Sequence, residues 1–234
     1  MGQLQRVVVA RSQIQGMQIR LEKDQTHYLQ RVLRLRVGDQ FIAMDGVGGT
    51  WLVEIGLEFA TIVEPLIVNS ELPQSVTLAI ALPKGSGFDD VVRQVTELGV
   101  ATIVPIISER TQLQPTEKKL ARWLKIAEEA AEQSERSIVP SILEPIAWKK
   151  YLMLEPTRDH RFLCWERGDS PGLRQALPNQ GSIELAIGPE GGWSNAEVDQ
   201  ALTAGYQPVS LGKRILRAVT ASVAAMAIVA AHQE

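Results

Sequence analysis

The chain has 234 residues, of which 45% are hydrophobic, 22% charged and 5% aromatic. This composition is that of a globular protein, and it excludes intrinsic disorder, a collagen-like repeat and a disulfide scaffold. At about 150 residues per domain, the length predicts one large domain or a small domain joined to a larger one. Cys164 is the single cysteine and the first residues lack the pattern of a secretion signal, so we expect a cytoplasmic protein.

The net charge of −3 is unevenly distributed along the chain. Residues 1–36 carry seven cations and two anions, whereas residues 37–72 carry six anions and no cation. A basic segment of this kind can form the electrostatic footprint that binds nucleic-acid phosphates. A solvated surface of mixed charges explains the same counts, and charge alone does not separate the two interpretations.

The first 72 residues read as short strands separated by Gly and Asp. Apolar β-branched runs predict strands, and helical spacing closed by Gly38 predicts one helix. The predicted strands are residues 5–10, 40–45, 50–55 and 61–68, and the predicted helix is residues 24–35. Turn residues at 69–73 then break the pattern. We therefore expect a small β-rich domain, a barrel with one helix, over residues 1–72.

From residue 73 onward, strands alternate with helices. The predicted strands are residues 76–82, 102–107, 161–165, 183–187 and 208–211, and the predicted helices are residues 88–98, 116–133, 147–154, 194–204 and 218–231. Such alternation predicts a parallel sheet covered on both faces, which gives an α/β domain over residues 73–234.

The predicted last helix, residues 218–231, is apolar apart from Thr220 and Ser222. Its 14 residues are too few to span a membrane, which takes about 20. A short helix that is apolar on all sides must be buried in protein. We expect it to lie in the core of its own chain or against a second copy, and we expect no membrane association.

Three loops follow strands at the carboxyl edge of the predicted sheet, where ligands of open parallel sheets bind. In the first, residues 188–192, three glycines allow backbone amides to approach a ligand, and Ser194 with Glu197 forms a capping box for the next helix. This loop fits neither the dinucleotide nor the phosphate-loop spacing, and a plain tight turn explains it equally well. The second, residues 211–217, carries three cations that need ion-pair partners or an anionic ligand. The third group joins Lys84 and Arg110, which a solvated loop would also explain.

Taken together and in order, these motifs resemble the bacterial 16S ribosomal RNA uridine-N3 methyltransferases of the SPOUT superfamily. The residues that carry the resemblance are Lys84-Gly85, Thr96–Val100, Ser108-Glu109-Arg110, Glu132-Gln133-Ser134, Arg136, Val139-Pro140, Ile187–Gly192, Leu211-Gly212 and Ile215–Arg217. His27-Tyr28-Leu29, Val32-Leu33-Arg34 and Gly38-Asp39 also fit the PUA-like RNA-binding domain of that family. The resemblance implies a SPOUT-type, trefoil-knotted parallel-sheet domain preceded by a PUA-like β-barrel, and a homodimer that acts on ribosomal RNA or the small ribosomal subunit.

The resemblance also implies which residues bind S-adenosylmethionine and RNA. The cofactor residues would be Ile187, Gly188, Pro189, Gly191, Gly192, Leu211, Gly212, Ile215 and Leu216. The RNA-binding residues would be Arg6, His27, Arg31, Arg34, Lys84 and Arg110, and no metal is expected. One departure stands out, because Ala218-Val219 occupies positions where the family commonly has Thr-Glu, so a general base at that place is missing.

Methylation of uridine N3 requires loss of the imide proton and stabilisation of the anion that it leaves. We expect Arg217 and Arg136 to stabilise the anion, and Glu97 or Glu190 to accept the proton, although structural ion pairs explain each residue about as well. Three other functions stay open: a SPOUT methyltransferase for a different RNA, a non-catalytic ribosome-assembly factor, and a mononucleotide-binding α/β protein. The last lacks any phosphate-loop pattern.

Overall fold

The computed structural model describes residues 4–111, 115–155, 158–167 and 169–233. Contacts within the chain divide it into two compact units. Unit 1 comprises Met1–Glu71 together with Glu128–Val139, and unit 2 comprises Leu72–Ala127 together with Pro140–Glu234. The predicted domain of residues 1–72 therefore omits a segment, residues 128–139, that returns from the second half of the chain.

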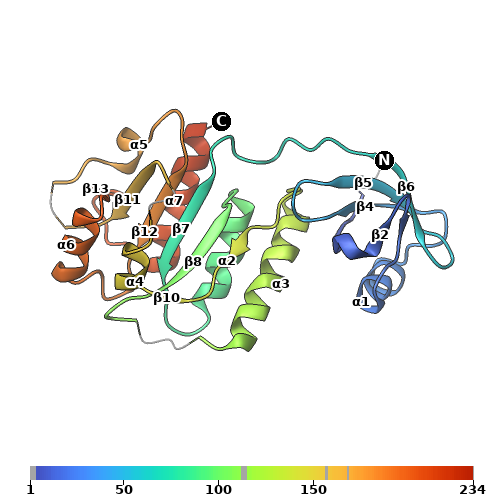
Figure 1. Cartoon of the computed structure of the whole chain (residues 1–234), viewed down its shortest axis with the longest axis horizontal. Helices are drawn as coiled ribbons and strands as arrows, with labels where there is room; N and C mark the ends of the chain where they lie inside the picture. Colours follow the sequence, from blue (N-terminus) through green and yellow to red (C-terminus); the bar gives the residue numbers. More distant parts are fainter. Residues whose placement is uncertain (1–3, 112–114, 156–157, 168, 234) are drawn as a thin grey trace. The chain divides into compact units, whose positions relative to one another are not determined.

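Unit 1 is built on a six-stranded sheet with the order β1-β4-β5-β6-β3-β2. Strands β2, β4, β5 and β6 of this sheet are labelled in Figure 1. Its strands are β1 (Arg6–Val8), β2 (Ile14–Gln15), β3 (Gln18–Ile19), β4 (Gln40–Met44), β5 (Thr50–Glu54) and β6 (Ala60–Pro65). β1 pairs with β4 in parallel and the other pairings are antiparallel. Three short helices complete the unit: η1 (Arg11–Gln13), α1 (Lys23–His27) and the π-helical turn η2 (Tyr28–Val32).

The core of unit 1 forms where alternate strand residues face inward. Phe41, Ala43 and Val53 are fully buried on β4 and β5, and Leu29 of η2 closes the core from the helical side. The predicted helix over residues 24–35 is thus shorter and changes pitch after His27. Two-residue strands such as β2 and β3 carry too little alternation for sequence patterning to reveal.

Unit 2 contains a parallel sheet with the order β10-β8-β7-β12-β11-β13, with β9 also paired to β8. Its strands are β7 (Val76–Ala81), β8 (Thr102–Ile107), β9 (Ser141–Ile142), β10 (Ile146–Ala147), β11 (His160–Cys164), β12 (Ile183–Ile187) and β13 (Gln207–Val209). Its helices are α2 (Gly87–Glu97), α3 (Glu117–Gln133, whose last turns belong to unit 1), α4 (Trp148–Leu152), α5 (Leu173–Ala176), α6 (Asn195–Thr203) and α7 (Ala218–Gln233).

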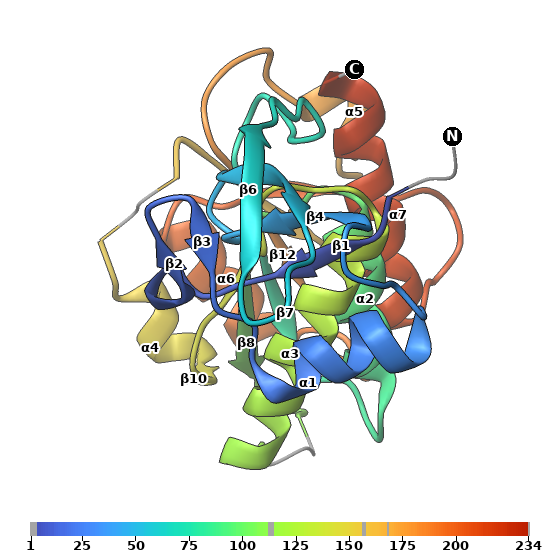
Figure 2. The same ribbon diagram turned by 90° about the vertical axis from the view of Figure 1, so that its right-hand side faces the viewer.

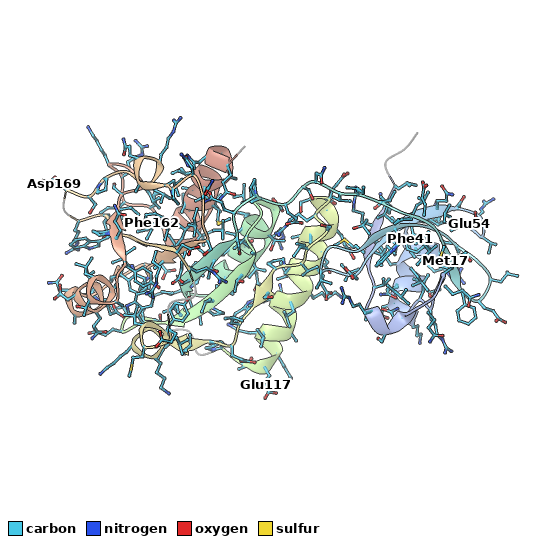
Figure 3. All side chains as sticks on the ribbon, turned by 45° about the horizontal axis from the view of Figure 1, so that its top comes forward. Met17, Phe41, Glu54, Glu117, Phe162 and Asp169 are labelled. Carbon is cyan, nitrogen blue, oxygen red and sulfur yellow. The ribbon has the colours of Figure 1, made fainter. Side chains whose placement is uncertain are left out.

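Helices cover both faces of this sheet, as its near-continuous apolar strands predict. One face packs on α4 and α6 through a cluster that includes Trp148, Trp193 and Val198. α7 contacts α2, β7 and β12, and Figure 2 shows α6 and α7 on opposite sides of β12. Phe162 of β11 points into the interior, whereas Glu117 at the start of α3 points outward (Figure 3).

α7 buries one side in its own unit. Ala221, Ser222, Ala225, Met226 and Val229 are buried, which accounts for part of the all-apolar composition. Thr220, Ala227 and Ala231 of α7 are exposed, so the outward side of the helix carries small side chains. Among the described residues, no helix is long and apolar enough to cross a membrane.

Candidate active site

A cavity opens in unit 2 where three neighbouring strands end. Cys164 of β11 is paired in register with Ile187 of β12 and with Val209 of β13, so the loops after these strands leave the sheet at the same level. The cavity is lined by Cys164, Trp165, Glu166, Ile187, Gly188, Pro189, Glu190, Gly192, Trp193, Leu211, Gly212, Arg214, Ile215, Leu216, Ala218 and Ala221.

The structure brings eight of the nine predicted cofactor residues into this lining. The exception is Gly191, whose carbonyl oxygen accepts a hydrogen bond from Nη1 of Arg110. Gly192 and Gly212 have φ angles of +67° and +116°, which a side chain rarely adopts. A Cβ on Gly188 would stand 3.1 Å from Nε1 of Trp193, so any larger residue would require the indole or the loop to shift by a few tenths of an ångström.

Hydrogen bonds from neighbouring loops hold the 188–192 turn in place. The backbone N–H of Lys84, after β7, donates to Oε1 of Glu190 over 3.1 Å. The backbone N–H of Glu109, after β8, donates to Oε1 of Glu197 over 2.8 Å. Glu197 also completes the predicted capping box, because Ser194 N–H donates to its Oε2. The loops that were singled out from the sequence therefore meet at one edge of the sheet.

Two of the four predicted catalytic residues lie at this cavity. Glu190 lines it and is exposed. Arg217 is exposed and stands between two lining residues, Leu216 and Ala218, at the point where α7 begins.

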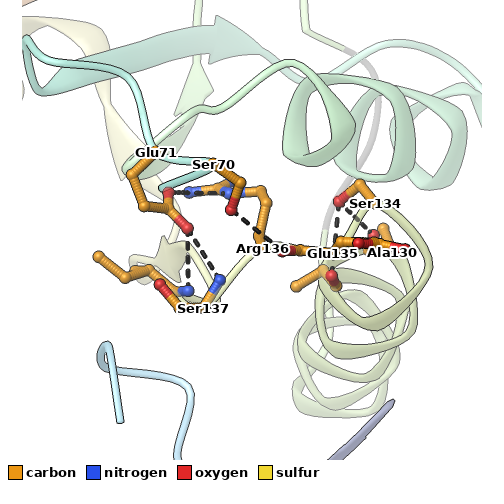
Figure 4. A network of polar contacts seen from close by, with 9 residues as sticks. Ser70, Glu71, Ala130, Ser134, Glu135, Arg136 and Ser137 are labelled. Atoms are coloured by element: carbon orange, nitrogen blue, oxygen red, sulfur yellow. Dashed lines mark hydrogen bonds and ion pairs between the residues drawn. The ribbon is translucent and has the colours of Figure 1, made fainter. Parts of the chain in front are cut away.

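Arg136, the third predicted catalytic residue, is instead part of a structural ion pair in unit 1 (Figure 4). Its guanidinium is 3% exposed and donates to Oε2 of Glu71 over 2.7 and 3.0 Å. The other carboxylate oxygen of Glu71 accepts the backbone N–H groups of Ser137 and Ile138. The guanidinium of Arg136 and the carboxylate of Glu71 are therefore paired inside unit 1, and the catalytic role of Arg136 stays a prediction.

Glu97, the fourth, lies at the wrong end of its helix. β7 ends at the carboxyl edge of the sheet and α2 runs back from there over eleven residues, about 16 Å. Glu97 is the last residue of α2 and therefore reaches the amino edge, from which β8 starts. Sequence order alone did not show this, because adjacent motifs in the chain alternate between the two edges of a parallel sheet.

The predicted RNA-binding residues divide into two groups. His27, Arg31 and Arg34 are exposed on α1, η2 and the turn that follows, and Lys84 and Arg110 are exposed beside the cavity loops. The side chain of Arg6 is instead 12% exposed and forms a 2.6 Å ion pair with Glu135. The charge of Arg6 is therefore paired within unit 1, and its contact with a phosphate stays a prediction.

Sequence reasoning missed the contribution of β11 to the cavity. Cys164, Trp165 and Glu166 line it, although the strand itself was predicted. The rule that ligands lie beyond the carboxyl ends of strands points to Glu166 as soon as that strand is placed. Burial raises the pKa of the Cys164 thiol to about 12, so this residue contributes a neutral, apolar wall. Within the described part of the chain, no cluster of three or more His, Cys, Asp or Glu residues could hold a metal.

Comparisons with known proteins agree with this arrangement. Residues 70–230 match the model of an RNA methyltransferase domain, and residues 21–64 match that of an RNA methyltransferase PUA domain. The parallel α/β sheet and the PUA-like β-rich domain expected from the sequence are thereby confirmed.

Relatives and solved structures extend over nearly the whole chain. A ribosomal RNA small subunit methyltransferase E from Synechocystis is 47% identical over 231 residues, covering 95% of this chain and 76% of the relative. The corresponding structure from Neisseria gonorrhoeae, bound to S-adenosyl methionine, superimposes with a TM-score of 0.88 at 31% identity, covering 96% of both chains. A methyltransferase structure from Legionella pneumophila, also with bound S-adenosylmethionine, has a TM-score of 0.88 at 30% identity and covers 98% of both chains. The chain therefore belongs to the family of RNA methyltransferases that includes the ribosomal RNA small subunit methyltransferases E.

Proposed function

We propose that this protein transfers a methyl group from S-adenosylmethionine to N3 of a uridine in small-subunit ribosomal RNA. The observation that carries the proposal is the cavity at the ends of β11, β12 and β13, whose walls are the glycine-containing loops 188–192 and 211–216. Two structures that resemble this chain over nearly its whole length contain bound S-adenosylmethionine.

The residues present fit this cofactor. Ile187, Leu211 and Leu216 give apolar walls for an adenine ring, and Gly192 and Gly212 let backbone groups approach it. Arg214 supplies a cation for the carboxylate of the methionine portion. When bound, the cofactor would supply a methyl group on a positively charged sulfur.

The residues of the chain then have two tasks in the reaction. The N3 proton must leave the uridine, and of the two carboxylates at the cavity we assign Glu190 to accept it. The negative charge spreads over O2 and O4, where the exposed guanidinium of Arg217 stabilises it. Because position 219 is Val rather than Glu, Glu190 takes the role that a carboxylate in α7 could otherwise fill. N3 lies on the pairing edge, so the uridine must be unpaired or flipped out.

Binding of the RNA and the state of assembly follow from the exposed groups. His27, Arg31 and Arg34 of unit 1, together with Lys84 and Arg110 of unit 2, are placed to contact phosphates. The outward apolar side of α7 is the surface that we assign to a second copy in a homodimer. We also infer the trefoil knot around the cavity and a cytoplasmic location, where ribosomal RNA and a reduced Cys164 are expected.

Calorimetric titration with S-adenosylmethionine tests the cofactor site. Gly192→Trp should abolish the binding seen with the wild type, because the indole would fill the cavity. Gly205→Trp is the matched control, since Gly205 has a similar φ angle of +88° but lies outside the lining and faces open space. Equal cofactor binding by both variants would show that the cofactor does not bind in this cavity.

Mapping the product tests the reaction. Ribosomal RNA and small subunits from cells that lack this activity should gain 3-methyluridine on incubation with the protein and cofactor, as measured by nuclease digestion and mass spectrometry. A methyl group on another atom or another RNA would indicate a different member of the superfamily. Cofactor binding without any methylation would favour the assembly-factor function.

A further inference from the structure

Among the described residues that line the cavity, three carry a charge: Glu166, Glu190 and Arg214. Oε1 of Glu190 already accepts the N–H of Lys84, and Arg214 is the cation suited to a carboxylate. Glu166 follows β11, and no role in the reaction described above involves it. Its Oε1 lies 3.4 Å from the point at which a Cβ would stand on Gly192, so the carboxylate lies over the bare glycine of the turn.

The surroundings of Glu166 restrict what it can bind. An ionised carboxylate only accepts hydrogen bonds, so its ligand must present a donor such as a hydroxyl, amino or ammonium group. Among the described residues, Glu166 has an ion pair with Arg167 at 3.9 Å, and the Arg167 side chain is 77% exposed, which gives a weak interaction. The carboxylate is therefore available to a ligand that enters beside Gly192.

We propose that Glu166 accepts the ribose hydroxyls of the adenosine portion of the cofactor and so selects ribonucleosides. The proposal rests on the assignment of the cavity to S-adenosylmethionine. A carboxylate beyond a strand end that receives ribose hydroxyls beside a glycine turn is a recurrent solution in other nucleotide-binding sheets. Arg214 stands on a different loop and takes the amino-acid end, which leaves Glu166 for the nucleoside end.

The test uses 5′-methylthioadenosine, which keeps the ribose hydroxyls and lacks both the ammonium and the sulfonium charge. Calorimetry should show that Glu166→Ala weakens binding of this compound and of S-adenosylmethionine by a similar factor, about tenfold to a hundredfold. Glu166→Gln should restore part of the affinity, because an amide oxygen still accepts a hydroxyl. The 2′,3′-dideoxy form of the compound should bind the wild type and Glu166→Ala equally weakly.

Glu144→Ala is the control, since Glu144 is exposed between β9 and β10 and does not line the cavity. Unchanged affinity of Glu166→Ala for methylthioadenosine would overturn the proposal. Weakened binding of S-adenosylmethionine alone would also overturn it, and would assign Glu166 to the ammonium or sulfonium group. If the wild type bound none of these compounds, the assignment of the cavity itself would fail, which is a separate result.

Discussion

Arg217 is exposed and Arg136 is buried, so we expect different effects when each side chain is removed. Arg217 is exposed between the lining residues Leu216 and Ala218, so removal of its side chain removes a charge from the surface and not from the interior. We expect Arg217→Ala to lose methylation by at least a hundredfold while its thermal unfolding stays within a degree or two of the wild type. Turnover at the wild-type rate in a quantitative methyl-transfer assay would contradict its catalytic role.

Arg136→Ala should have the opposite effect. Removing this guanidinium leaves the carboxylate of Glu71 partly buried without its cation, a loss that costs about 3 to 5 kcal/mol. Denaturant unfolding would measure this loss, and cofactor affinity of the folded fraction should be unchanged. An Arg136→Ala variant that is as stable as the wild type but inactive would instead indicate that Arg136 acts in catalysis.

Arg34 lies in the left-handed region with φ of +60°, where a residue with a Cβ is strained by about 1 to 2 kcal/mol. Arg34→Gly relieves this strain and Arg34→Ala keeps it, so the glycine variant should be more stable by about 1 kcal/mol. Both variants should lose RNA affinity equally and reduce the slope of log affinity against log salt by about one phosphate contact. Retained affinity and slope in both would show that Arg34 does not contact RNA.

At the scale of the element, the end of α3 holds the edge of the unit 1 sheet. Oε1 of Glu132 accepts the backbone N–H of Val8 in β1 over 2.7 Å, and this satisfies an edge-strand donor. Burial raises the pKa of Glu132 to about 7, assisted by Glu128 and Glu129 and opposed by the hydrogen bond from Val8.

This raised pKa predicts a pH-dependent stability. The folded state holds the proton more tightly than the unfolded chain, so stability should fall as the pH rises from about 4.5 to about 7 and then level off. Glu132→Gln still accepts the Val8 N–H without ionising. The loss of unfolding free energy across this window should therefore be about 3 kcal/mol smaller for Glu132→Gln than for the wild type, as measured by urea unfolding at a series of pH values. Parallel pH profiles for the two proteins would exclude an ionisation of Glu132 in that range.

Long elements were predictable from the sequence, whereas their partners were not. The bounds of β8 and β12 equal the predicted ranges, because continuous apolar runs between turns define buried strands. The glycine loops were also predictable, because glycines that directly follow a strand are visible in the local sequence. The ion pairs of Arg136 with Glu71 and of Arg6 with Glu135 join residues 65 and 129 positions apart, and periodicity carries no information on such distances.

At the scale of the whole molecule, α7 provides the test of self-association. Its exposed positions 220, 227 and 231 follow helical spacing and form one outward stripe of small side chains. Ala227→Glu should convert the proposed dimer to a monomer in sedimentation experiments. Ala121→Glu, on the exposed side of α3, is the control and should leave the dimer intact. A monomeric wild type would exclude this use of the stripe.

The return of residues 128–139 to unit 1 sets an order for folding during protein synthesis. All six strands of unit 1 leave the ribosome before this segment exists, so the partners of Arg6, Val8 and Glu71 are not yet available. At about 5 to 20 residues per second, the nascent sheet waits several seconds with these groups unpaired. The first part of the chain to be made therefore cannot be the first to reach its final structure, and it is completed only after the opening βαβ portion of unit 2 has been translated.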